Sequence, residues 1–220
     1  CGTALLIGSV APASAHSMFG QPPAPGVNVC DEMQPGPHIL MTPTGHPRPD
    51  DVSRAASVVA AAQTALAKYT DVQAAQADGY LYDGPQIPKS IEQYVCYHFT
   101  NASNAYAEQF GFDPTTPTSL LYAKVNGAFQ LQGMMYTAPL SMTPDEVDAR
   151  VPAAVWPWHQ HVQVCEIAKG DFTSPGPKSQ FGLSGSIDTP DACAAAGGIY
   201  VSHLYAWMDH VLLPGTTGTH

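Results

Sequence analysis

Histidine is the residue type through which this sequence could most directly carry out chemistry. His159 and His161 stand two positions apart in the segment Trp-Pro-Trp-His-Gln-His. On a β-strand, residues two positions apart point to the same face of the sheet. Two imidazole rings on one face can bind a single ion, so this spacing predicts a metal site.

Two further histidines lie inside apolar segments, His98 in Tyr-His-Phe and His210 in Trp-Met-Asp-His-Val. An ionisable ring in apolar surroundings needs either a buried partner or a ligand role. Imidazoles that come from separate strands and meet on one face suit copper, zinc or non-haem iron. We therefore expect a copper or zinc site with the ligands His98, His159, His161 and His210. The competing interpretation is that each ring is packed and satisfied by a backbone carbonyl.

The other strand and loop histidines are not expected to bind the metal ion. His203 would share a face with His210 only if the segment between them were helical. Three others are expected in loops or in the tail, exposed to solvent: His38, His46 and His220.

Other donors follow the His-x-His pair. Glu166 extends it to His-x-His-x4-Glu, which resembles the first metal motif of the cupins. On an unbroken strand, however, Glu166 faces away from both rings, and the second cupin motif has no counterpart around His210. Cys165 shares a face with His161 and could be a thiolate ligand, but a disulfide is its expected fate in an exported protein. The sequence contains no Gly-x-Ser-x-Gly nucleophile motif and no phosphate-binding or dinucleotide-binding loop.

The chain is acidic and poor in charge. It has 8 Lys and Arg residues against 18 Asp and Glu residues in 220 positions, which gives a formal net charge of -10. Scattered basic residues make no phosphate-binding surface, so we expect neither nucleic acid nor an anionic membrane as a partner. A hydrophobic fraction of 45% is typical of a packed globular protein. The expected partners are a metal ion and an unknown small molecule, and no transmembrane segment is expected.

Residues 1–15 are interpreted as the remnant of an export signal. Their apolar run is too short to span a bilayer and ends in Ala-Ser-Ala, the small-x-small pattern of a signal-peptidase site. The expected mature N-terminus is His16 or Ser14, and the expected location is extracellular or periplasmic.

Two alternatives concern the same region. A mature N-terminal His16 could chelate copper through its amine and its ring, as in the histidine brace of copper polysaccharide monooxygenases. Cys1 could instead be a lipidated cysteine.

Four cysteines follow the signal, and an even number in an oxidising compartment predicts two disulfides. Four cysteines allow three pairings. We favour Cys30 with Cys96 and Cys165 with Cys193, because each of these pairs closes a loop of moderate length.

Periodicity and turn residues indicate the elements that must position these side chains. Residues 16–50 are rich in Pro and Gly and are expected to form an arm or loop, not a strand of a central sheet. Helices are expected over 51–69 and 70–79, with short ones starting at Thr143 and Thr189. Strands are expected at 94–100, 119–125, 128–137, 156–167 and 199–213, with a tight hairpin at Asn126-Gly127.

Together these elements predict a single α+β domain over residues 51–220. Its N-terminal helices should pack on a mostly antiparallel β-sheet or a partly closed barrel.

Several short motifs resemble those of a group of exported bacterial proteins that have no established activity. The motifs are Ala-Lys-Tyr-Thr-Asp-Val and Ala-Asp-Gly-Tyr (67–72, 77–80), Tyr97-His98, Asp113-Pro114 with Pro117 and Leu120-Leu121-Tyr122, Trp158-His-Gln-His-Val to Cys165, Cys193 with Gly197-Gly198, and Trp207-Met-Asp-His-Val with Pro214-Gly215. The group's usual Tyr-His-Tyr is Tyr-His-Phe here. The resemblance implies that the four histidines belong together, and it implies no reaction.

The sequence therefore predicts an exported protein with a histidine-rich copper or zinc site. One form of this hypothesis is a metalloenzyme, an oxidoreductase or a hydrolase, with an open coordination position. A second is a non-catalytic copper or zinc carrier. A third is a metal-free envelope protein whose histidines are merely packed.

Overall fold

The fold is described from a computed structural model, which covers residues 27–31, 35–43, 47–167, 180–183 and 185–216. The expected export signal lies outside these ranges, together with Cys1, His16, His46 and His220. No helix in the described ranges is both long and apolar enough to cross a membrane.

A seven-stranded sheet forms the centre of the molecule, with the order β1-β5-β7-β4-β3-β2 and with β6 paired to β5. Every pairing is antiparallel. The strands are β1 (Ile39–Met41), β2 (Tyr97–Thr100), β3 (Ser119–Val125), β4 (Ala128–Ala138), β5 (His159–Ile167), β6 (Gly198–His203) and β7 (Trp207–Leu212). The predicted mostly antiparallel sheet is confirmed, and it is open, not closed into a barrel.

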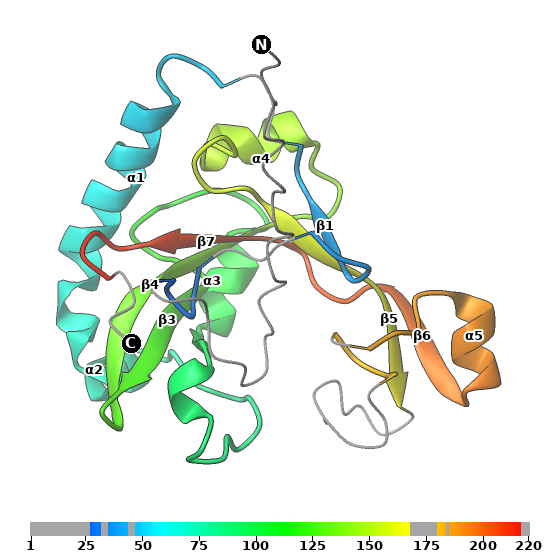
Figure 1. The fold of residues 1–220 in the computed structure, drawn as a ribbon. Helices are drawn as coiled ribbons and strands as arrows, with labels where there is room; N and C mark the ends of the chain where they lie inside the picture. The colour runs from blue at the N-terminus through cyan, green and yellow to red at the C-terminus, as the bar shows by residue number, and fades with distance from the viewer. Residues whose placement is uncertain (1–26, 32–34, 44–46, 168–179, 184, 217–220) are drawn as a thin grey trace, which may run out of the picture.

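Five helices accompany this sheet in the described residues, and α1 and α2 lie along one side of it (Figure 1). They are α1 (Asp51–Leu66), α2 (Val72–Ala77), α3 (Ala102–Ala107), α4 (Pro144–Arg150) and α5 (Pro190–Ala195), with single 3-10 turns η1 (Ala67–Thr70) and η2 (Glu92–Tyr94). The predicted N-terminal helices are confirmed as α1 and α2, whereas α3 was not predicted. The β5–β6 ribbon and α5 extend away from α1 and α2 on the far side of the molecule (Figure 1).

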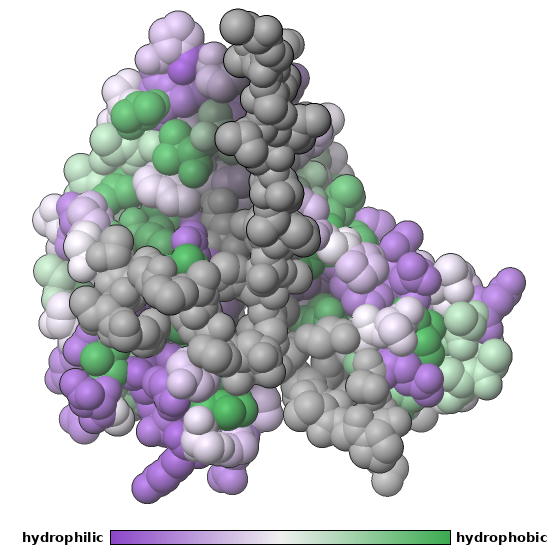
Figure 2. Space-filling view, viewed as in Figure 1, coloured by the Kyte–Doolittle hydropathy of each residue, from purple (hydrophilic) through white to green (hydrophobic). Residues whose placement is uncertain are grey.

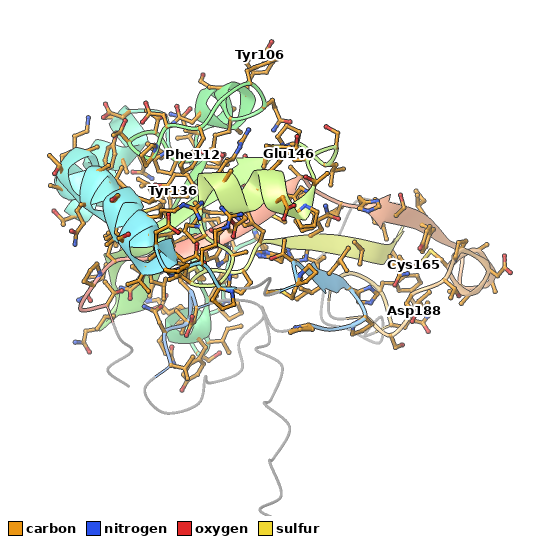
Figure 3. All side chains as sticks on the ribbon, turned by 90° about the horizontal axis from the view of Figure 1, so that it is seen from above. Tyr106, Phe112, Tyr136, Glu146, Cys165 and Asp188 are labelled. Carbon is orange, nitrogen blue, oxygen red and sulfur yellow. A yellow bond between two sulfur atoms is a disulfide. The ribbon has the colours of Figure 1, made fainter. Side chains whose placement is uncertain are left out.

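The two faces of the sheet bury different side chains. The face under α1 and α2 holds the larger core, which is rich in aromatic rings and includes Tyr97, Phe99, Leu120, Tyr122, Met134, Tyr136, Trp158 and Val211. Figure 3 shows Tyr136 beside Phe112, whose ring centroid lies 5.0 Å away, while Tyr106 points away from the body. The opposite face holds a smaller apolar cluster of Cys30, Leu121, Met135 and Met208. Successive side chains along each strand therefore point alternately into the larger core and into the smaller cluster.

The Pro/Gly-rich arm contributes a strand, so the prediction that it lies outside the sheet is wrong. Ile39–Met41 forms β1 and pairs with β5, with Ile39 opposite His161 and Met41 opposite His159. The three residues of β1 contain no proline, and β1 lies at the end of the sheet, where a short strand between prolines is tolerated.

The predicted last strand over 199–213 is two strands. β6 pairs with the outer half of β5, whereas β7 pairs with β4 and, at His159, with β5. β5 changes partners near Gln163, which has a left-handed φ of 57°. β6 therefore lies off the path of the other six strands and pairs with β5 alone.

Two disulfides hold the chain, with the pairing that the sequence favoured. Cys30–Cys96 joins residues 66 positions apart and Cys165–Cys193 joins residues 28 positions apart. The first ties the arm to the strand that begins at Tyr97, and the second ties α5 to β5 in the projecting ribbon (Figure 3).

Two turn predictions are also confirmed. Asn126 and Gly127 have φ angles of 52° and 79° between β3 and β4, as a tight hairpin needs. Thr143 and Glu146 form a reciprocal capping box at the start of α4.

The hairpin gives a matched test of backbone strain. An added Cβ atom would meet nothing within 4 Å at either Gly127 or Gly111, but only Gly127 has a left-handed φ. Gly127→Val should therefore lower the free energy of unfolding by about 1–2 kcal/mol, measured by urea denaturation. Gly111→Val is the control and should change it little. Equal midpoints for the two variants would contradict the turn geometry.

Candidate metal centre

Strand register places the four predicted histidines on one face of the sheet. His159 lies opposite Met208, His210 opposite Met135, and His98 opposite Leu121. Opposed residues on neighbouring strands share a face, and Leu121, Met135 and Met208 belong to the smaller apolar cluster. The histidines therefore lie on the face turned away from α1 and α2.

The structure brings the four rings into one contiguous cluster. The ring centroids of His98 and His210 are 4.9 Å apart, and those of His210 and His159 are 5.4 Å apart. His159 and His161 are also 5.4 Å apart. The series of ring contacts continues to Tyr205, whose ring centroid lies 5.8 Å from that of His161. Tyr205 is 49% exposed, so it connects the cluster to the surface. Sequence reasoning missed Tyr205, because its position depends on the bend between β6 and β7.

Contact between His98 and His210 requires a curved sheet. β3 and β4 separate β2 from β7, so the strands would be about 14 Å apart in a flat sheet. Gly133 on β4 lies opposite both Leu121 and Leu212, so β4 carries no side chain at this position between the two strands. A Cβ atom at Gly133 would come within 2.4 Å of the Val211 carbonyl oxygen, which shows how closely β4 and β7 approach there.

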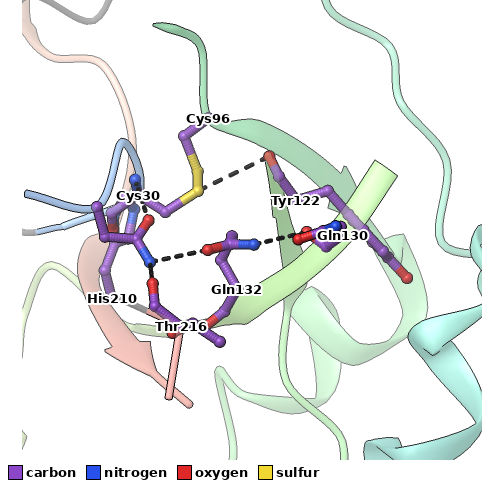
Figure 4. Close-up of a disulfide and its surroundings, with 8 residues drawn as sticks. Cys30, Cys96, Tyr122, Gln130, Gln132, His210 and Thr216 are labelled. Atoms are coloured by element: carbon purple, nitrogen blue, oxygen red, sulfur yellow. Dashed lines mark hydrogen bonds between the residues drawn. A yellow bond between two sulfur atoms is a disulfide. The ribbon is translucent and has the colours of Figure 1, made fainter. Parts of the chain in front are cut away.

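The segment that contains Cys30 covers part of this face. The Nδ1 atom of His210 lies 3.3 Å from the carbonyl oxygen of Cys30 (Figure 4). A carbonyl oxygen only accepts, so Nδ1 carries the proton in this hydrogen bond and Nε2 keeps its lone pair. The disulfide to Cys96 then links this cover to β2, two residues before His98.

Two ring nitrogens of the cluster are buried without a hydrogen-bond partner among the described residues. They are Nε2 of His159 and Nδ1 of His161, in side chains of residues that are only 1% and 2% exposed. Leaving a buried polar atom unpaired costs about 1–3 kcal/mol. Both atoms are therefore suited to bind a ligand.

Burial keeps all four imidazoles uncharged at neutral pH. It lowers the pKa of His98 and that of His161 to about 4, and neighbouring histidines add a smaller effect at His161. Burial, and then the other histidines, lowers the pKa values of His159 and His210 well below the usual 6.5. The neutral ring is the form that binds metal ions.

The ring nitrogens do not converge as they stand. Within the residues that the structure describes, no group of three or more His, Cys, Asp or Glu side chains is arranged to hold a metal ion. The ring planes of His159 and His210 meet at 86°, as do those of His159 and His161. Coordination by three rings would need rotation of at least one side chain.

The other donors considered in the sequence lie elsewhere. Cys165 is in a disulfide and is not a thiolate ligand. Glu166 is opposite Ile199 in the β5–β6 ribbon, beyond the part of β5 that carries the two histidines. His203 is exposed at the end of β6.

His38 is buried, so the prediction that it is exposed to solvent is wrong. The residue is 2% exposed, and its Nδ1 and Nε2 atoms lie 3.3 Å and 3.0 Å from the carbonyl oxygens of Val162 and Gly185. The pairing of β1 with β5 draws it inside. Its position before the apolar run Ile-Leu-Met was the available signal in the sequence.

A cavity of about 580 Å³ lies elsewhere, between α1, Trp156 and Leu212–Thr216, and none of the four histidines lines it. Figure 2 shows small hydrophobic patches scattered among hydrophilic residues on the visible face, without one large patch. The buried histidine cluster is therefore the feature with the clearest chemical capacity. Comparisons with protein-family models, curated proteins and solved structures found no match.

The low pKa values predict that acid destabilises the metal-free protein. His98 and His161 have pKa values of about 4 in the folded chain, but about 6.5 when unfolded. The unfolded chain then binds more protons between these values, so stability falls as the pH drops from about 6.5 towards about 4. Each such histidine contributes up to about 1.4 kcal/mol per pH unit in this window.

Urea denaturation of EDTA-treated protein at pH 7 and pH 5 measures this effect. Substitution His161→Gln should make the pH dependence shallower, and His203→Gln should leave it unchanged. An equal or higher midpoint at pH 5 than at pH 7 in the unsubstituted protein would contradict the prediction.

Proposed function

We propose that this protein binds one copper or zinc ion through the imidazoles of His159, His161 and His210, with His98 at the edge of the site. The observation that carries this proposal is the pair of unpartnered, buried nitrogens on His159 and His161. These atoms belong to neighbouring rings on one strand, and a metal ion would satisfy both.

The surroundings favour holding an ion over catalysis. Three of the four histidines are no more than 2% exposed, and the cavity beside α1 does not reach them. A catalytic ion keeps an open position for water or substrate, whereas a structural or stored ion is enclosed. We therefore propose a non-catalytic metal-binding protein, which replaces the metalloenzyme as the first hypothesis and includes no small-molecule substrate.

The proposed place of action is outside the cytosol, in the extracellular space or periplasm. Two disulfides support it, because such bonds persist in oxidising compartments. Four neutral rings also suit a compartment near neutral pH, where they stay unprotonated.

A metal-free protein with packed histidines is the second candidate. The right-angled contacts of His159 with His161 and His210 favour it, because edge-to-face packing is a common arrangement of rings that only fill space. In that case the cluster would contribute stability and no binding.

Metal analysis distinguishes the two candidates. Protein without a His tag, stripped with EDTA and then dialysed against Cu²⁺ or Zn²⁺, should retain about one ion per chain by mass spectrometry. The double variant His159→Ala/His161→Ala should retain none, because it removes both unpartnered nitrogens. His203→Ala replaces an exposed histidine and is the matched control, which should bind normally.

Circular dichroism in the near ultraviolet should verify that each variant remains folded. If the double variant is folded and keeps full metal content, the ion binds elsewhere. If the unsubstituted protein retains no ion, the packed-histidine candidate is correct.

A further inference from the structure

We infer that the site prefers copper, as Cu(I), to zinc, because Met135 and Met208 offer thioether sulfurs beside the imidazoles. This inference rests on the proposed function and adds the identity of the ion and two further donors. It follows from the strand register and from the charge of the surroundings.

Each methionine is the direct cross-strand neighbour of a proposed ligand. Met208 on β7 lies opposite His159 on β5, and Met135 on β4 lies opposite His210 on β7. Such pairs have Cβ atoms about 4.5–5.5 Å apart on the same face of the sheet. A methionine side chain has three rotatable bonds and can bring its sulfur towards the neighbouring ring.

Both methionines are also enclosed with the histidines. They are 7% and 6% exposed, and they pack in one cluster with Cys30, whose carbonyl oxygen faces His210. The sulfurs are therefore held on the side of the sheet where the ring nitrogens lie. Mixed thioether and imidazole donors are soft and select Cu(I), whereas Zn²⁺ favours imidazole, thiolate and carboxylate ligands.

The charge of the surroundings points to the same ion. The proposed donors are imidazole rings and thioether sulfurs, which carry no charge in the forms that bind a metal ion. Asp209, next to His210, lies opposite Tyr136 and therefore on the α1 side of the sheet. The cost of burying an ion rises with the square of its charge, so a neutral, buried set of donors accepts a monovalent ion more readily than a divalent one.

The test compares Cu(I) and Zn²⁺ affinities of methionine variants. Cu(I) is supplied anaerobically as its acetonitrile complex and competed with bicinchoninate, without a thiol reductant that would open the disulfides. The double variant Met135→Leu/Met208→Leu keeps the buried volume and removes both sulfurs. We expect it to lose about tenfold or more in Cu(I) affinity, with Zn²⁺ affinity changed less than about twofold.

Met134→Leu is the matched control, because Met134 is buried on the same strand but faces the core under α1. It should leave the Cu(I) affinity unchanged. X-ray absorption of the Cu(I)-loaded protein should show a copper–sulfur distance that is lost in the double variant and kept in the control.

The outcomes separate this inference from the proposed function. Unchanged Cu(I) affinity in the double variant, or tighter binding of Zn²⁺ than of Cu(I) by the unsubstituted protein, would overturn the preference and leave the metal site standing. Failure of the unsubstituted protein to bind either ion would overturn both.

Discussion

Contact between uncharged imidazole rings on the curved face of the sheet is the interaction on which the rest of this structure depends. The rings of His98 and His210 meet at 4.9 Å although two strands separate β2 from β7. The sheet must therefore curve, the backbone of β4 must approach β7 at Gly133, and the Cys30 segment must cover the rings. Burial disfavours a charged ring, and a positive charge on one ring would make protonation of its neighbours less favourable, so the same packing keeps the whole cluster uncharged.

The two faces of the sheet perform different tasks with the same strands. In β7, Trp207 and Val211 pack into the aromatic core under α1, while His210 between them points to the opposite face. The larger core supplies apolar burial, which offsets the cost of the His159 and His161 ring nitrogens that have no hydrogen-bond partner among the described residues. The strands that bury the larger core also hold the proposed binding site, so a substitution that shifts these strands should affect both the stability of the fold and the site.

Much of the fold could be predicted from local signals in the sequence. The hairpin at Asn126-Gly127 and the capping box at Thr143 depend on a few neighbouring residues, and the His-x-His spacing alone places two rings on one face. The remainder depends on register between distant segments. His38 became buried because β1 pairs with β5, and Met208 became the neighbour of His159 through a pairing that no local pattern encodes. The backbone break at Gln163 in β5 was likewise not predicted. As a result, the single strand expected over 199–213 is two strands, β6 and β7, which pair with different parts of β5.

The Cys30–Cys96 disulfide has a consequence for the order in which the protein matures. It joins the cover over His210 to β2, and the same cover is also held by hydrogen bonds from Asn28 to Gln132 and Thr216 (Figure 4). While the thiols are reduced, only non-covalent contacts hold the cover in place. Oxidation then ties the cover covalently to β2, next to His98. The disulfide thus limits how far the cover can move away from His210 without breaking a covalent bond.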